Sequence, residues 1–146
     1  MKNQRIIVLL QDSAIPESIK HSEIENILIE RGFNIWIKTI KPQDSGKRFI
    51  PTILDIFRKH KSDSLFIVIS SGNLFNSIKT DDTENIINAI SRVKKDYPNL
   101  SWGISTTHVP IEKESFVDFY FQKDIKNRTK EMVKNISIII DQKTRD

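Results

Sequence analysis

Several residue types that define whole classes of protein are scarce or missing in this sequence. It contains no cysteine, which excludes disulfide bonds and thiol catalysis. Only four glycines and five prolines occur among the 146 residues, which argues against a repetitive or disordered chain. The first apolar run, Ile6–Leu10, is too short for a signal peptide or a membrane span, so a cytoplasmic location is expected.

A strong excess of one charge is also missing. The net charge of +4 is small for a lysine-rich chain and does not indicate a nucleic-acid-binding protein. Hydrophobic residues make up 38% of the chain and charged residues 29%, which are ordinary values for a globular protein. The length fits a single domain with one core, covering residues 1–146.

An apolar run in the middle of the sequence organises the predicted fold. Leu65–Ile69 is unbroken, rich in β-branched residues and followed by Ser70, Ser71 and Gly72. This pattern predicts a strand that is covered on both faces, as at the centre of a parallel sheet. Arg5–Leu10 is a second continuous run and predicts a neighbouring buried strand.

The other elements alternate between strand and helix. Phe33–Lys38 alternates apolar and polar residues, which predicts a strand nearer the sheet edge. Two more strands are predicted at Leu100–Ser105 and Phe116–Phe121. Helices are predicted for Pro16–Arg31, ended by Gly32, and for Ile50–Lys61, Asp81–Tyr97 and Ile125–Ile140.

This alternation predicts an α/β fold with five parallel strands. The expected architecture is a flavodoxin-like doubly wound sheet with strand order 2-1-3-4-5. The stretch His108–Ser115, between the last two strands, contains Pro110 and lacks a helical apolar stripe. It is shorter than the ~10–12 residues of a normal crossover, so the fourth helix is expected to be short or missing.

The carboxyl ends of the strands in such a sheet form the usual functional crevice. The polar residues predicted to lie at or near this edge are Gln11, Asp12, Ser70, Ser71, Thr106, His108 and Lys123.

Two stretches resemble the receiver domain of response regulators. Glu84–Thr106 is similar to the third helix and fourth strand of that family, and Phe116–Lys126 is similar to its fifth strand. Within the second stretch, Tyr120 and Lys123 match the family's switch aromatic and the lysine three positions later. The resemblance implies the flavodoxin-like fold and a regulatory role.

The receiver pattern is incomplete at its chemical centre. The family has two acidic residues after the first strand and an acceptor aspartate at the end of the third, where this chain has Gln11-Asp12 and Ser70-Ser71. One carboxylate is a poor Mg²⁺ site, and without a carboxylate nucleophile no acyl phosphate forms. The resemblance therefore implies a pseudo-receiver: a non-catalytic, unphosphorylated interaction module without metal or cofactor, in which Thr106 and Lys123 have no phosphoryl group to bind.

Other stretches resemble a Toll/interleukin-receptor (TIR) domain. They are Arg31–Trp36, Lys41–Gly46 and Ser70–Ser77. This resemblance implies an alternative function, either an NAD-cleaving enzyme with Glu84 as its catalytic residue or an adaptor. The tryptophan that usually precedes this glutamate is missing. A third alternative is a flavodoxin-like domain that binds a small ligand at Ser70–Asn73.

The fifth predicted strand is unusually aromatic, with Phe119, Tyr120 and Phe121 in succession. An apolar edge strand is a hazard for unwanted pairing unless something covers it. Because Tyr120 matches the receiver switch aromatic, we expect association with another protein, or with a second copy, through these residues and the start of the last helix. The alternative is that the last helix and the preceding loop bury both faces. Neither nucleic acid nor a membrane is expected as a partner.

Overall fold

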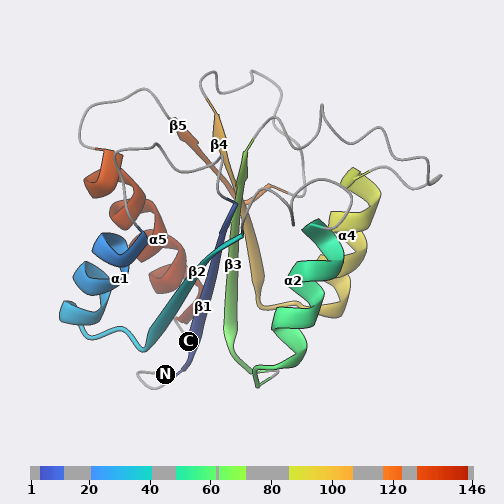
Figure 1. Cartoon of the computed structure of the whole chain (residues 1–146), viewed down its shortest axis with the longest axis horizontal. Coiled ribbons are helices and arrows are strands. Elements are labelled where there is room, and N and C mark those ends of the chain that lie inside the picture. The colour runs from blue at the N-terminus through green and yellow to red at the C-terminus, as the bar shows by residue number, and fades with distance from the viewer. Residues whose placement is uncertain are drawn as a thin grey trace.

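The computed structural model describes residues 4–11, 21–40, 49–61, 63–71, 86–106, 117–122 and 128–144. In this part of the chain, one sheet is covered by helices on both faces (Figure 1). The strands are β1 (Ile6–Gln11), β2 (Ile35–Ile40), β3 (Leu65–Ser71), β4 (Leu100–Thr106) and β5 (Phe119–Gln122). The helices are α1 (His21–Glu30), α2 (Phe49–Arg58), α4 (Ile86–Asp96) and α5 (Arg128–Thr144).

The sheet has the order β2-β1-β3-β4-β5, and each neighbouring pair is parallel. This confirms the predicted flavodoxin-like architecture and puts β3 at the centre. The short or missing helix predicted between β4 and β5 falls on residues 107–116, outside the described residues. None of the described helices is both long enough and apolar enough to cross a membrane.

Two apolar cores lie on opposite faces of the sheet. Helices α1 and α5 cover one face and α2 and α4 cover the other (Figure 1), and we call these the α1/α5 core and the α2/α4 core. In β1, Ile7 and Leu9 join the α2/α4 core, while Val8 and Leu10 join the α1/α5 core. Successive side chains of a strand point to opposite faces, so a strand covered on both sides must be apolar at every position.

Strand β2 is an edge strand, and its burial alternates as its sequence predicts. The Ile6 amide of β1 donates to the carbonyl of Asn34, so every second residue of this segment, counted from Asn34, directs its backbone groups toward β1. Ile37 is not one of these residues, and its amide therefore points to the open edge of the sheet. Glu25 of α1 accepts a hydrogen bond from this amide at 2.8 Å. The carboxylate therefore occupies a position that a further strand would need.

Helix α1 ends at the predicted glycine. Gly32 has a φ of 94°, a left-handed conformation that side chains disfavour. The Gly32 amide donates to the carbonyl of Ile29, and the Phe33 amide donates to the carbonyl of Leu28. This pair of bonds is a Schellman motif, which satisfies carbonyls that the helix leaves without partners and turns the chain into β2.

Strand β5 begins at Phe119, three residues later than the predicted start at Phe116. The reason is Asp118. Its amide donates to the carbonyl of Trp102 at 2.8 Å, and its own carboxylate accepts from the Trp102 amide at 2.6 Å. The side chain thus replaces a backbone acceptor and ends the ladder between β4 and β5.

Candidate functional site

The carboxyl ends of the parallel strands meet at one edge of the sheet, at the top of Figure 1. Strand β1 ends there with Gln11, whose side chain is buried. The last paired residues of β1 and β3 are Leu10 and Ile69, so Gln11 and Ser70 follow side by side. The fold thus brings together the ends of β1 and β3, as predicted.

Ser70 is fully buried, and its hydroxyl accepts a hydrogen bond from the indole Nε1 of Trp102 at 2.9 Å. Trp102 lies on β4 and is also fully buried, packed in the α2/α4 core. A buried indole N–H needs an acceptor, and the serine supplies one. The Ser70 hydroxyl is therefore a structural partner as well as a residue of the candidate crevice.

The predicted site residues are only partly described. Ser71 pairs with Ser105, and Thr106 pairs with Gln122, so both occupy the expected strand ends. Three further predicted residues, Asp12, Glu84 and Lys123, lie outside the described residues, as does His108. The described residues contain no group of three or more histidine, aspartate or glutamate side chains arranged to hold a metal ion.

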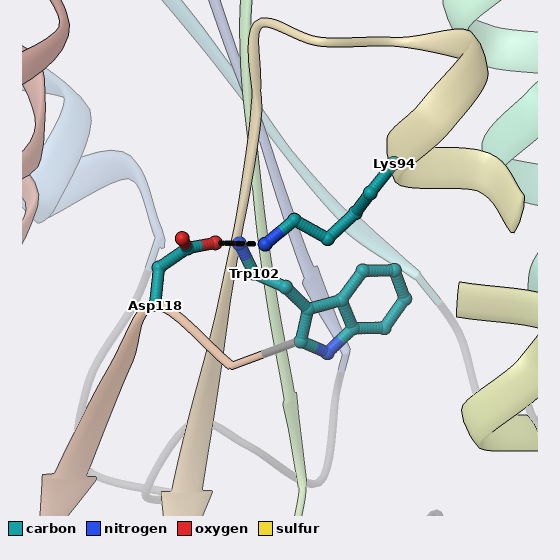
Figure 2. A network of polar contacts seen from close by, with 3 residues as sticks. All are labelled: Lys94, Trp102 and Asp118. Atoms are coloured by element: carbon teal, nitrogen blue, oxygen red, sulfur yellow. Dashed lines mark hydrogen bonds and ion pairs between the residues drawn. The ribbon is translucent and has the colours of Figure 1, made fainter. Parts of the chain in front are cut away.

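A second polar network lies where β4, β5 and α4 meet, and the sequence did not reveal it. Figure 2 shows two donors, the Trp102 amide and the Lys94 ammonium, directed at the Asp118 carboxylate. The Lys94 Nζ lies 2.8 Å from Asp118 Oδ2, and the two side chains are 22% and 27% exposed. A single carboxylate oxygen therefore ties helix α4 to the entry of β5.

Trp102 takes part in both sets of polar contacts. Its indole N–H donates to Ser70 of β3, and its backbone amide donates to Asp118. The available signal was Asp118 itself, a lone charge within the apolar run Phe116–Phe121. A charged residue at the start of an aromatic strand indicates a specific partner, here a backbone amide and a lysine.

The aromatics predicted as a partner face are shared between the two cores. Phe119 is half-buried against the α1/α5 core, and its ring lies directly over Gly103 of β4. Tyr120 is half-buried against the α2/α4 core. The side chain of Phe121 is outside the described part of the structure.

Comparison with known proteins shows the fold and no sequence family. Neither a protein-family model nor a curated protein sequence matches the chain. A signal receiver domain of an HD-domain protein from Pseudomonas fluorescens Pf-5 superposes with a TM-score of 0.55 at 14% identity, covering 96% of this chain and 98% of that one. A response regulator from Thermotoga maritima gives a TM-score of 0.54 at 14% identity, with 94% and 98% covered. HP1043, an orphan response regulator of Helicobacter pylori, gives 0.52 at 17%, with 95% and 98% covered.

These similarities define the class of fold: the chain has the flavodoxin-like fold of receiver domains. None of the structures named here is a TIR domain, so the TIR-like alternative gains no support from them.

Proposed function

We propose that this chain is a receiver-like regulatory module that acts through protein contacts and is not phosphorylated. The observation that carries this proposal is the uncharged end of β3, which finishes with Ser70 and Ser71. A receiver needs a carboxylate there to accept a phosphoryl group, and further carboxylates beside it to hold a divalent ion. Strand β1 offers Gln11 at that edge, and the Ser70 hydroxyl already accepts the Trp102 indole N–H.

The test is incubation with acetyl phosphate and with a histidine kinase, followed by an assay for hydroxylamine-labile phosphate. We expect none, whereas a receiver that carries the acceptor aspartate, treated in parallel, becomes labelled. Calorimetry with Mg²⁺ should show no binding tighter than about 1 mM, because one carboxylate and neutral oxygens are weak ligands for this ion. A labile phosphate or a tight Mg²⁺ site would overturn the proposal.

An assay of NAD cleavage with the same purified protein tests the enzyme alternative. Purified chain should consume NAD no faster than background. Release of nicotinamide that disappears in Glu84→Ala would replace the regulatory proposal with a TIR-like hydrolase.

We further propose that the partner surface is formed by Phe119, Tyr120 and Phe121 together with the start of α5. Two observations support it: β5 is an edge of the sheet, and Phe119 and Tyr120 are only half-buried, so each keeps accessible apolar surface. Half-exposed aromatic residues are frequent anchors of protein interfaces because one side chain buries a large area.

The partner surface is tested by light scattering at high micromolar concentration and by capture of native partners. Tyr120→Glu should lose association, and its circular dichroism and unfolding midpoint must show that it is folded, since Tyr120 also contacts the α2/α4 core. Ile29→Glu is the matched control, because Ile29 is 49% exposed on α1, away from β5. A monomeric wild type, together with a Tyr120→Glu variant that still captures the partners, would reject this surface.

A further inference from the structure

The opposite end of the sheet carries a cluster with no role in the proposed function. Arg5 directly precedes β1 and has the same alternation as Ile7 and Leu9, so its side chain lies on the α2/α4 face. Trp36 of β2 packs against the same core. Helix α2 ends at Arg58, and the turn that follows brings the His60 ring to 5.2 Å from the Trp36 ring, with the two planes inclined by 45°.

Within this cluster, the Arg5 guanidinium is held in place, and no carboxylate of the described residues forms an ion pair with it. Its Nη1 donates to the side-chain oxygen of Asn34 at 2.8 Å, and Asn34 is an uncharged partner. Within the described residues, the ion pairs join Arg58 to Asp55 and Lys94 to Asp118, and neither involves Arg5. A half-buried guanidinium keeps unused donors, and a carboxylate or phosphate would be their preferred acceptor.

The surroundings of His60 are mostly cationic. The charged side chains that the neighbouring elements contribute are Arg5 before β1, Lys38 of β2, Asp55 and Arg58 of α2, Lys59 and Lys61 after α2, and Asp63 before β3. Burial, and secondly the charge of Arg5, lower the pKa of His60 below its usual value. The imidazole is therefore neutral near pH 7, and an anion beside it would favour uptake of a proton.

We propose that Arg5 and His60 bind a tetrahedral oxyanion, such as sulfate or a phosphate group, beside the Trp36 ring. The guanidinium offers paired N–H donors of the geometry that such anions accept. His60 adds a third donor and a second positive charge when it is protonated. The opposing influence is the negative end of the α2 dipole, near which Lys59 adds a positive charge.

Proton uptake makes the site dependent on pH in a defined direction. An anion that prefers protonated His60 must bind more tightly as the pH falls, and it must raise the pH at which His60 titrates. Sulfate is the best probe because its charge does not change between pH 5 and 8, so any pH dependence of binding belongs to the protein.

The experiment follows the His60 imidazole resonance by NMR from pH 5 to 8, with the signal assigned by its loss in His60→Gln. Sodium sulfate is compared with sodium chloride at equal ionic strength, because salt alone also screens the charge of Arg5. We expect the titration midpoint in sulfate to exceed that in chloride by about half a pH unit or more, a threefold or larger preference for the protonated form.

Matched variants separate a site from general screening. Arg5→Met should abolish the difference between sulfate and chloride, whereas Arg58→Met should keep it, because Arg58 is exposed and already paired with Asp55. If Arg5→Met does not fold, His60→Gln provides the test: sulfate should stabilise the wild type against heat more at pH 6 than at pH 8, and this pH difference should vanish in the variant.

The source of the anion is resolved by a third arm with O-phosphoserine at equal ionic strength, compared with sulfate at pH 7, where its phosphate group is mostly doubly charged, as sulfate is. A response equal to that of sulfate assigns the site to phosphate groups of larger molecules, and a response to sulfate alone assigns it to a free anion. Equal titration midpoints in sulfate and chloride, or loss of the sulfate effect in Arg58→Met as well, would overturn the proposal.

Discussion

The indole N–H of Trp102 donates a hydrogen bond to the hydroxyl of Ser70, at a point where both side chains are fully buried. Ser70→Ala leaves the indole N–H without an acceptor, so the free energy of unfolding should fall by about 1–3 kcal/mol. Urea denaturation followed by far-UV circular dichroism measures this loss.

Ser101→Ala is the control for Ser70→Ala. Ser101 is also fully buried on the sheet, but its hydroxyl has no hydrogen-bond partner within the described part of the chain. Removing a hydroxyl that lacks a partner should leave stability unchanged within about 0.5 kcal/mol, or raise it. Equal losses in the two variants would mean that the indole bond is not the cause.

Gly103 and Phe119 form a second test, one of steric fit. They are paired residues of β4 and β5, and a Cβ at Gly103 would overlap the Phe119 ring. Gly103→Ala should therefore cost about 1–3 kcal/mol through overpacking, measured by chemical denaturation. In the background of Phe119→Leu, the same change should cost less, because the planar ring has been removed.

Gly32→Ala distinguishes steric overlap from backbone strain. Gly32 has a positive φ, but the space around a Cβ at this position is open. Its substitution should cost about 1 kcal/mol by strain alone, and this cost should be the same with Phe119 or Leu at position 119. A cost of Gly103→Ala that does not depend on residue 119 would contradict the packing explanation.

Asp118 tests whether a side chain sets the start of β5. Asp118→Ala removes the acceptor of the Trp102 amide and the partner of Lys94, and we expect a loss of about 1.5–3 kcal/mol. Asp118→Asn keeps an acceptor oxygen and loses only the charge, so its cost should be smaller.

The exposed pair Arg58–Asp55 supplies the control for Asp118, since Asp55→Asn should change stability by less than about 1 kcal/mol. Hydrogen exchange at the Trp102 amide should accelerate in Asp118→Ala. Protection equal to that of the wild type would show that the carboxylate does not hold this amide.

His60 predicts how stability depends on pH. Burial and the charge of Arg5 lower the pKa of its imidazole in the folded state. As the pH falls through about 6.5, the unfolded chain takes up a proton that folded His60 resists, so stability should decrease from there down to the lowered pKa. Above this window the contribution of His60 is constant.

Urea denaturation at pH 5.5 and 7.5 measures the effect in the wild type and in His60→Gln, in low-salt buffer without sulfate or phosphate. The difference between the two pH values should shrink in the variant. An identical pH dependence in both proteins would show that His60 titrates normally.

The elements that the sequence predicted well are those whose patterns arise from burial. Each of these patterns can be recognised in a short stretch of sequence without knowledge of distant contacts. Examples are the continuous apolar runs of β1 and β3, the alternation in β2 and the end of α1 before Gly32. The start of β5 was predicted wrongly because Asp118 meets Trp102, 16 residues away, and no local pattern reports that contact. For the candidate site, the sequence predicted only which residues end the strands. The hydrogen bond between Trp102 and Ser70 could not be predicted, because it depends on the sheet face toward which each side chain points once the strands have paired.

The carboxylate of Glu25 on the Ile37 amide has a consequence for assembly. A sheet in which both edge strands can pair with another copy is able to grow without limit, because each added copy leaves one such edge strand open for the next copy. Here one edge strand, β2, is closed by a charge from the chain's own helix. If two copies pair through their β5 edges, growth stops at the dimer, because the two outer edges are then β2 strands, which Glu25 blocks. The geometry of a single glutamate thus favours a finite complex over a fibre.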